Sequence, residues 1–338
     1  MSNLPEVAVV ILSWNGKKFL EQFLPSVSAS IYPNLKIYVA DNASTDDTVP
    51  FLASNYPKIN ILKLDKNTGF AGGYNKALVQ VKSDYYVLLN QDVEVTKNWI
   101  APVIDLMETD KNIAACQPKI RAYYNKDYFE HAGAAGGRLD TWGYPFCYGR
   151  IFEYVEKDEN QYNSPNEIFW ATGACLFIRS ELFQSIGGFD EDYFAHMEEI
   201  DLCWRLKNIG YKIMYQPAST VFHVGGGSLP KGNPKKTYLN FRNSLVSIAK
   251  NMSSLKAINT IIMRMILDHI AAYRALFLGL PKEWGAIARA HFYFFTHLPH
   301  ILKKRNKIVR KEKFSKMPGV YNHSAVWTYY VLGKKTIE

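Results

Sequence analysis

The sequence predicts an α/β fold with a doubly wound, mixed, Rossmann-like sheet, followed by an amphipathic helical C-terminal region. Apolar strand-like runs alternate with helix-like segments through roughly the first hundred residues, which is the pattern of consecutive βαβ units. Each run ends at small or polar residues, at the edge where open α/β sheets bind ligands. From about residue 236, long apolar segments rich in Lys and Arg replace this alternation.

The first strands are expected where the sequence is continuously apolar, which is typical of strands buried on both faces. The segments between them have helical character, and Ser44 or Thr45 is available to cap the helix that starts near Asp46. In chain order we expect a strand at 7–13, a helix at 18–27, a strand at 36–40, the helix from 46, a strand at 60–64, a helix at 72–81 and a strand at 85–89.

The middle of the chain is expected to be less regular. Residues 120–165 are rich in Gly, Tyr and Asn, which favours loops and hairpins. We then expect a strand over 169–178 and a helix over 198–209. No internal repeat or low-complexity tract interrupts this order.

The C-terminal segments are apolar but carry charges. Residues 257–278 contain Arg264, Asp268 and Arg274, which argues against a membrane-spanning helix. Residues 284–298 contain three Phe and precede a Lys-Lys-Arg run, which favours an interfacial amphipathic helix with a polybasic end. The alternative is a helical subdomain that packs on the body and leaves a solvated basic face.

Charge is unevenly distributed along the chain. The formal net charge is +9, yet residues 231–313 hold 17 Lys and Arg against 3 acidic residues, so the rest of the chain is slightly acidic. A basic rear of this kind suggests an anionic surface as partner. Because the basic residues are dispersed among apolar ones, a membrane face is favoured over nucleic acid.

Cysteine usage and the first residues indicate the compartment. The four cysteines are scattered and form no C-x-x-C pair, which argues against a disulfide framework or a zinc knuckle and fits a reducing compartment. The chain starts without the basic residues of a secretion signal. The expected location is therefore cytoplasmic.

Two strand ends carry features that suit a nucleotide. Asp41 closes an apolar run, and its carboxylate can accept a hydrogen bond from a ribose hydroxyl or a pyrimidine imide, or instead form a turn that caps the next helix. Residues 67–75 form a glycine-rich turn, where backbone can approach a phosphate or a sugar closely. This turn matches neither G-x-G-x-x-G nor a P-loop.

Two further groups suggest metal binding and acid–base chemistry. Asp92 follows an apolar strand, and together with His223 and a diphosphate it could hold a hard cation; alone it would be a turn residue. Glu198, Glu199 and Asp201 stand at a helix start, where the helix dipole favours negative charge. Glu198 and Asp201 share a face by i,i+3 spacing, so Glu199 is free to face a cleft as a base.

Together these motifs resemble the inverting family 2 glycosyltransferases of GT-A fold, and within them the bacterial branch that includes rhamnosyltransferases. The resemblance runs in order over residues 7–228, through Ser13-Trp-Asn15, Asp41-Asn-Ala-Ser44, Asn67–Asn75, Leu89-Asn-Gln-Asp92, Thr172–Arg179, Gly187–Phe194, Glu198–Arg205 and 221–228. The helical rear matches in kind only.

The resemblance implies a role for each motif residue. The nucleoside would be held by Ser13, Asn15 and Asp41, and the ribose and diphosphate pocket shaped by Asn67, Gly69 and Asn75. A divalent cation, Mn or Mg, would bind Asp92 and His223, and Glu199 would be the catalytic base. The sugar and acceptor pocket is assigned to Trp170, Thr172, Gly173, Asp201 and Arg205.

Two positions depart from the family pattern. Asn90 stands at the first position of the metal motif, so the cation would have one carboxylate fewer. The catalytic position carries Glu where the family has Asp, one methylene longer, which leaves Glu198 as an alternative base to Glu199.

The expected protein is an inverting glycosyltransferase with a GT-A catalytic domain over 1–235, divided into a nucleotide-sugar half of about 1–120 and an acceptor half of about 121–235. Residues 236–338 would form the basic, aromatic, membrane-facing region. The donor would be dTDP-rhamnose, or alternatively a UDP-sugar. The acceptor would be a lipid-linked cell-surface polysaccharide at the inner face of the membrane, and no nucleic acid is involved.

Two other functions remain compatible with the sequence. A sugar-phosphate nucleotidylyltransferase would need a Gly-rich, Arg- or Lys-bearing loop after the first strand, where this chain has Trp14-Asn15-Gly16. A non-catalytic glycan-binding scaffold of the same fold is favoured by Asn90 and disfavoured by Glu199 and His223.

Overall fold

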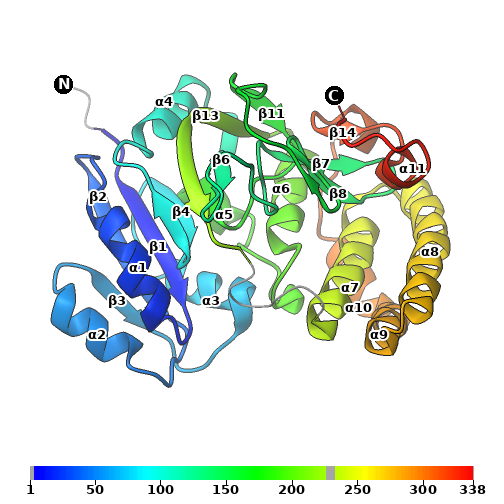
Figure 1. Ribbon diagram of the computed structural model, residues 1–338, viewed down its shortest axis with the longest axis horizontal. Coiled ribbons are helices and arrows are strands. Elements are labelled where there is room, and N and C mark those ends of the chain that lie inside the picture. Colours follow the sequence, from blue (N-terminus) through cyan, green and yellow to red (C-terminus); the bar gives the residue numbers. More distant parts are fainter. Residues whose placement is uncertain (1–3, 226–232, 338) are drawn as a thin grey trace.

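The computed structural model describes residues 4–225 and 233–337, so residues 226–228 of the motif after His223 lie outside the described residues (Figure 1). Within the described residues, nine strands form a mixed sheet in the order β11-β13-β6-β12-β4-β1-β2-β3, with β5 paired to β13. Their bounds are β1 Val7–Ser13, β2 Leu35–Asp41, β3 Asn60–Lys63, β4 Tyr85–Asn90, β5 Val93–Val95, β6 Ile113–Ala122, β11 Asn166–Ile168, β12 Cys175–Arg179 and β13 Lys212–His223.

The parallel half of the sheet is built as the sequence predicts. β1 pairs in parallel with β2 and β4, and β2 with β3, so their carboxyl ends meet at one edge. The register places Ser13 opposite Asp41 and Leu12 opposite Asn90. The helices of this half are α1 Lys17–Ser28, α2 Thr48–Asn55, α3 Gly69–Leu78 and α4 Ala101–Thr109.

The antiparallel half brings distant segments to the same edge. β12 runs antiparallel to β4 and β6, and β13 runs parallel to β6 with an irregularity between Gln216 and Thr220. The last residue of β13, His223, pairs with Val93 of β5 and therefore lies beside Asp92. The helices that follow β12 are α5 Ser180–Ser185 and α6 Glu198–Asn208.

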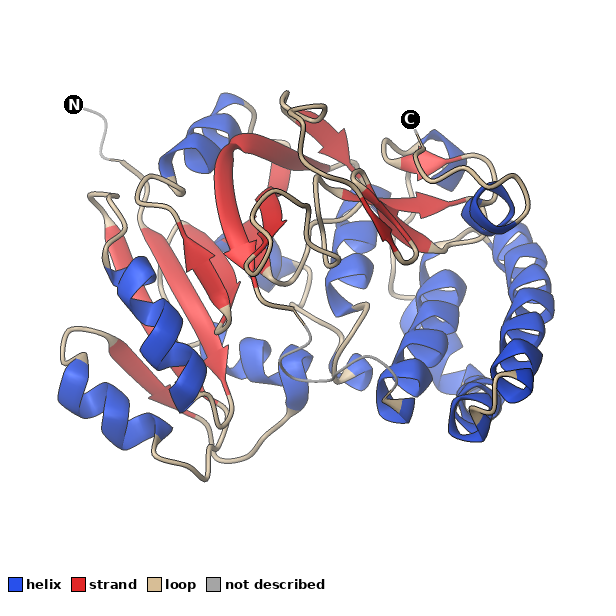
Figure 2. Cartoon of the chain, in the orientation of Figure 1, coloured by secondary structure: helices blue, strands red, loops and turns tan. Residues whose placement is uncertain are grey.

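A second, small sheet and five further helices complete the described part of the chain (Figures 1 and 2). The small sheet contains β10 Tyr154–Val155, β9 Arg150–Ile151, β8 Pro145–Cys147, β7 Gly137–Asp140 and β14 Val320–Tyr321, and β14 pairs in parallel with β7. The helices are α7 Pro234–Asn251, α8 Ser254–Phe277, α9 Pro281–Thr296 and α10 Leu298–Arg305, with the short α11 Ala325–Tyr330 after β14. In Figure 1, α7, α8 and α9 stand at the opposite end of the molecule from α1 and α2.

Helix α8 is turned so that Arg264 and Asp268 face inward, while Arg274 in its last turn is exposed. Arg264 and Asp268 are buried and form an ion pair of 3.4 Å, which Tyr144 and His291 extend. The opposite face leaves isoleucines at four-residue spacing more than half exposed to solvent, namely Ile258, Ile262, Ile266 and Ile270. No helix of the described part of the chain is both long enough and apolar enough to cross a bilayer.

Three local predictions were wrong. The strand expected over 169–178 is a strand only from Cys175, because Trp170 forms a bridge to Gly137 of the small sheet instead. The helix expected from residue 72 starts at Gly69, inside the glycine-rich turn. Ser44 does not cap the next helix, because its hydroxyl accepts the backbone N–H of Asn15.

Candidate active site

The ends of β1 and β2 form the first wall of the candidate site. Asp41 is buried, and both of its carboxylate oxygens lie 3.3 Å from the backbone nitrogen of Ser44, so the turn expected as an alternative is present. These contacts are long for N–H···O hydrogen bonds, which leaves acceptor capacity on the carboxylate. Ser13 donates to Gln91 Oε1 at 2.8 Å. Gln91 was not predicted as a site residue, but this hydrogen bond places its side chain beside Ser13.

Asn15 ties two loops together. Its backbone is left-handed, with φ 49°. Its Oδ1 accepts the backbone N–H of Thr45 at 2.8 Å, and its own N–H donates to Ser44 Oγ at 2.9 Å. The loops after β1 and β2 are therefore fixed relative to each other at the sheet edge.

The glycine-rich turn is held by an asparagine that the sequence analysis did not single out. Asn42 Nδ2 donates to Asn67 Oδ1 at 3.2 Å and to the carbonyl of Gly69 at 3.1 Å, and its Oδ1 accepts the N–H of Thr68. Asn67 Oδ1 also accepts the N–H of Gly69 at 2.9 Å. The signal for Asn42 was its place beside Asp41 at a strand end.

Two residues at this turn contact the segment before α6. Gly69 has φ +74°, and a Cβ there would lie 2.5 Å from the carbonyl oxygen of Phe194, so only glycine fits. The side chain of Asn75 donates to the carbonyl of Phe189 and accepts its N–H, both at 2.9 Å. Asn75 therefore holds the backbone at Phe189 in place, and it contributes to the pocket only through that segment.

Asp92 and His223 lie together, as the predicted metal site requires. Asp92 Oδ1 is 3.3 Å from His223 Nε2, and the other ring nitrogen, Nδ1, is 3.1 Å from Glu130 Oε2. All three side chains are buried. Burial would lower the pKa of His223, but the charges of Asp92 and Glu130 outweigh it and raise this pKa to about 10. Asn90 Nδ2 lies 3.4 Å from His223 Nε2.

This arrangement fits a cation that takes two ligands from the chain. A carboxylate that engages the far nitrogen of a metal-binding imidazole is the usual outer partner of such a ligand, and Glu130 occupies that place. Across the described residues no group of three or more His, Cys, Asp and Glu is arranged to hold a metal ion. Other ligands would therefore have to come from a bound substrate or from water.

Glu198 and Glu199 differ in their surroundings at the start of α6. Glu198 is buried, whereas Glu199 is partly exposed, and neither Oε2 has a hydrogen-bond partner among the described residues. Burial raises the pKa of Glu199 to about 7, opposed by backbone N–H groups that include that of Gly173. Burial and the neighbouring Glu199 raise the pKa of Glu198 well above its usual range.

The predicted pocket residues around Trp170 are more enclosed than expected. Trp170 Nε1 donates to the carbonyl of Arg138 at 3.0 Å, and the indole lies against Gly137. The backbone N–H of Thr172 donates to Gln117 Oε1 at 2.9 Å. Of the predicted pocket residues on this segment, Gly173 lies next to Glu199: a Cβ on Gly173 would be 3.9 Å from Glu199 Cβ. The same Cβ would be 3.1 Å from the Phe70 ring.

Asp201 and Arg205 form a buried brace in place of the predicted pocket wall. Asp201 accepts from Arg205 Nε at 2.9 Å and from Asn251 Nδ2 at 2.8 Å, and it pairs with Lys250 at 2.9 Å. Burial would raise the pKa of Asp201, but Lys250 and Arg205 hold this pKa well below its usual range. Arg205 also donates to the carbonyl groups of Ile186 and Gly188. These contacts join α6 to α7 and to the turn at Ile186 and Gly188 that follows α5.

A family profile and a relative of known activity both identify the chain as similar to glycosyltransferases. The profile of the family "Glycosyl transferase family 2" matches residues 8–187. The chain is 28% identical over 230 residues to the N-acetylglucosaminyl-diphospho-decaprenol L-rhamnosyltransferase of Mycobacterium tuberculosis, which covers 64% of this chain and 75% of that protein.

Two solved structures share the fold. The mannosyltransferase PcManGT from Pyrobaculum calidifontis, in complex with GDP-Man and Mn2+, has a TM-score of 0.54 at 16% identity and covers 87% of this chain and 76% of its own. GalNAc-T7 with UDP, GalNAc and Mn2+ has a TM-score of 0.61 at 16% identity and covers 98% of this chain and 57% of its own.

Proposed function

This chain belongs to glycosyl transferase family 2, and we propose that it moves a sugar from a nucleotide-diphosphate donor to a hydroxyl of a lipid-linked glycan with inversion at the anomeric carbon. The observation that carries the proposal is the position of Glu199. The residue is partly exposed beside Gly173, its Oε2 is buried without a hydrogen-bond partner among the described residues, and burial raises its pKa to about 7.

Glu199 is the proposed general base. A base is most effective when its pKa lies near the working pH, because it is then both ionised and able to accept a proton. Glu198 is the weaker candidate, since it is buried and its pKa is raised well above the usual range. The acceptor hydroxyl would give its proton to Glu199 as its oxygen attacks the anomeric carbon and the bond to the diphosphate breaks.

The strand-end residues would hold the donor. Asp41, with Ser13 and Asn15 beside it, would accept hydrogen bonds from the nucleoside, and the turn at Asn67 and Gly69 would approach the ribose and diphosphate.

Asp92 and His223 would hold a divalent cation, Mn or Mg, with Glu130 fixing the orientation of the imidazole. A cation bound there would supply positive charge beside the leaving diphosphate. Two structures of the same fold contain Mn2+ together with a nucleotide or nucleotide sugar, which supports this assignment.

A rhamnosyl donor is favoured by the similarity to the mycobacterial rhamnosyltransferase, whose name also specifies a lipid diphosphate acceptor. The test is a thermal-shift screen with dTDP, UDP, GDP and NAD, each with and without Mn²⁺, followed by transfer assays with the matching sugar nucleotides. A Mn²⁺-dependent rise with dTDP, and an NMR-determined product configuration opposite to that of the donor, would support the proposal. A rise with NAD alone, or a product with retained configuration, would contradict it.

We further propose that α8 and α9 rest on an anionic lipid surface at the cytoplasmic face of the membrane. The apolar stripe of α8, formed by Ile258, Ile262, Ile266 and Ile270, is continued along the helix by Phe277, which is 90% exposed, and α9 also exposes Phe292. This exposed stripe has no partner among the described residues, and a contiguous exposed apolar surface is typical of an interaction site.

The charge around the stripe favours lipid over a second copy of the chain. Arg274 of α8 and Lys282 of α9 are exposed, and residues 231–313 carry 17 basic residues against 3 acidic ones. A positive rim repels a second positive copy and attracts anionic headgroups.

Co-sedimentation with vesicles of anionic and of neutral lipid tests this assignment, with Ile262→Ser and Ile266→Ser combined as the variant. The wild type should sediment with anionic vesicles, and the variant should bind about tenfold or more weakly, because each isoleucine contributes on the order of 1 kcal/mol. A wild-type protein that ignores vesicles and forms dimers, which the variant abolishes, would assign the stripe to a second copy instead.

A further inference from the structure

The segment between Tyr193 and α6 has an unusual backbone. Phe194, His196 and Met197 have φ values of 63°, 68° and 72°, in the left-handed region that non-glycine residues rarely occupy. Met197 is the N-cap residue of α6, which begins with Glu198 and Glu199. A strained segment of this kind persists only where surrounding contacts hold it.

The same segment touches the glycine-rich turn. The carbonyl of Phe194 accepts the N–H of Phe70 at 2.7 Å and that of Ala71 at 3.3 Å, and the Phe194 ring covers Gly69. Residues 193–197 therefore connect the turn proposed to hold the donor with the helix that carries the proposed base. A change in their conformation would move both.

Asn243 of α7 supplies the contacts that hold this segment. Its buried Nδ2 lies 3.1 Å from the carbonyl oxygen of Tyr193, 3.0 Å from that of Ala195 and 2.7 Å from that of His196. An amide nitrogen has two hydrogens, so three carbonyls share them. The three carbonyl groups are gathered around one donor.

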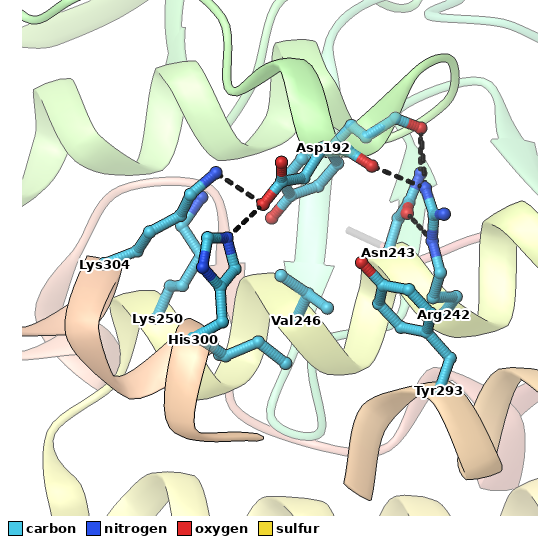
Figure 3. Close-up of a pocket in the computed structure, with 10 residues that line it drawn as sticks. Asp192, Arg242, Asn243, Val246, Lys250, Tyr293, His300 and Lys304 are labelled. Carbon is cyan, nitrogen blue, oxygen red and sulfur yellow. Dashed lines mark hydrogen bonds and ion pairs between the residues drawn. The ribbon is translucent and has the colours of Figure 1, made fainter. Parts of the chain in front are cut away.

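Arg242 fixes the direction of that amide. Its Nε donates to Asn243 Oδ1 at 2.7 Å, which identifies the oxygen of the side chain and turns Nδ2 toward the carbonyls. Its Nη2 donates to the carbonyls of Asp192 and Tyr193, both at 2.8 Å. Figure 3 shows Arg242 and Asn243 on one side of Asp192, with Lys304 and His300 on the other.

Helix α10 completes the attachment from the other side. Lys304 pairs with Asp190 and Asp192, and His300 Nε2 lies 2.8 Å from Asp192 Oδ2. Part of the basic charge of the C-terminal region is thus bound to carboxylates of the catalytic body. The small cavity in Figure 3 lies within this junction, and none of the residues assigned to the candidate active site lines it.

We propose that Asn243, oriented by Arg242, is a positioning residue for Glu199. It holds residues 193–197 in the conformation that presents the first turn of α6 to the acceptor, so α7 is part of the working catalytic unit. The proposal rests on the proposed transfer function for its kinetic consequence, but the holding of the segment can be measured without activity.

The test compares Asn243→Asp with Ser244→Ala in the full-length protein. Asp has the shape of Asn but presents oxygens to the three carbonyls. Ser244 is the next residue of α7, is equally buried, and contacts Arg264 of α8 at 2.6 Å instead of the segment, so it controls for general loss of stability. Asn243→Ser, which keeps one donor, is the second variant in case Asn243→Asp does not fold.

Three measurements are made on each variant: kcat and KM for the acceptor, the pH profile of kcat, and hydrogen exchange of residues 193–199. For Asn243→Asp we expect kcat to fall by about 10- to 100-fold, as misplacement of a catalytic group does, with a shifted pH profile and faster exchange in 193–199. Asn243→Ser should lie between this variant and the wild type, and Ser244→Ala should match the wild type in kcat and in exchange there.

Unchanged exchange of residues 193–199 in both Asn243 variants, or a kcat within twofold of the Ser244→Ala value, would overturn the proposal. A wild type that transfers no sugar from any donor would refute the proposed function alone. The exchange comparison would in that case still decide whether Asn243 holds the segment.

Discussion

Replacing Glu199 with Gln should stabilise the protein at neutral pH while abolishing sugar transfer. Burial raises the pKa of Glu199 to about 7, against an ordinary value of 4.5. Above pH 4.5 the folded protein therefore holds a proton that the unfolded chain has released, and the free energy of unfolding falls as the pH rises toward 7. Gln carries no charge in either state and does not suffer this loss.

The magnitude follows from the two pKa values. Their difference corresponds to about 3.4 kcal/mol if all of it arises on folding. The Gln amide that replaces the carboxyl also loses water on folding, so we expect the variant to recover on the order of 1–2 kcal/mol, or ~2–5 °C in Tm. The gain should be full above pH 7, decline between pH 7 and 4.5, and vanish below pH 4.5, where the carboxyl is protonated in both states.

Differential scanning calorimetry at pH 8 and pH 5 measures this effect, with Glu181→Gln on the exposed face of α5 as the control. In the wild type, kcat/KM should also fall about tenfold for each pH unit below ~7, because the ionised base is lost. A Glu199→Gln protein that is no more stable than wild type at pH 8 would refute the account of a destabilised carboxylate. One that still transfers sugar would refute the assignment of the base.

Three other substitutions are informative. Gly69→Ala should lower the Tm and weaken donor binding measured by calorimetry, because its Cβ would lie 2.5 Å from the Phe194 carbonyl oxygen at a φ of +74°. Glu130→Gln should weaken Mn²⁺ affinity by roughly 10- to 100-fold in a metal titration, since it removes the negative charge of the outer partner of His223; unaltered affinity would exclude that role. Asp201→Asn should cost about 3–5 kcal/mol in urea unfolding, because it removes the charge from a buried ion pair, while donor affinity stays near wild type; lost donor affinity without destabilisation would return Asp201 to the pocket.

Local patterns were sufficient for much of the sheet edge. The run Val7–Ser13 is a strand over its full predicted length, because a continuous apolar stretch has no alternative to burial. Helical spacing also separated Glu199 from Glu198 and Asp201, and the structure leaves Glu199 as the more exposed of the three. A buried strand and the face that a helical residue occupies are both determined by residues nearby in the sequence.

Features that depend on distant partners were not predictable. Glu130 lies 93 residues before His223, and nothing around it signals a link to that ring. Arg264 and Asp268 lie four residues apart and therefore share one face of α8, but this spacing does not tell whether that face points inward. The charged face does so because Tyr144 and His291 surround the pair of Arg264 and Asp268.

The pairing of β14 with β7 also has a consequence for synthesis on the ribosome. β7 ends at Asp140 and its partner begins at Val320. At a translation rate of ~5–20 residues per second, about 180 residues require roughly 10–40 s. During that interval one edge of β7 has no strand beside it and is open to pairing with another chain. Slow or crowded expression should therefore favour aggregation through this edge, and a chaperone that covers residues 137–140 would protect the nascent chain.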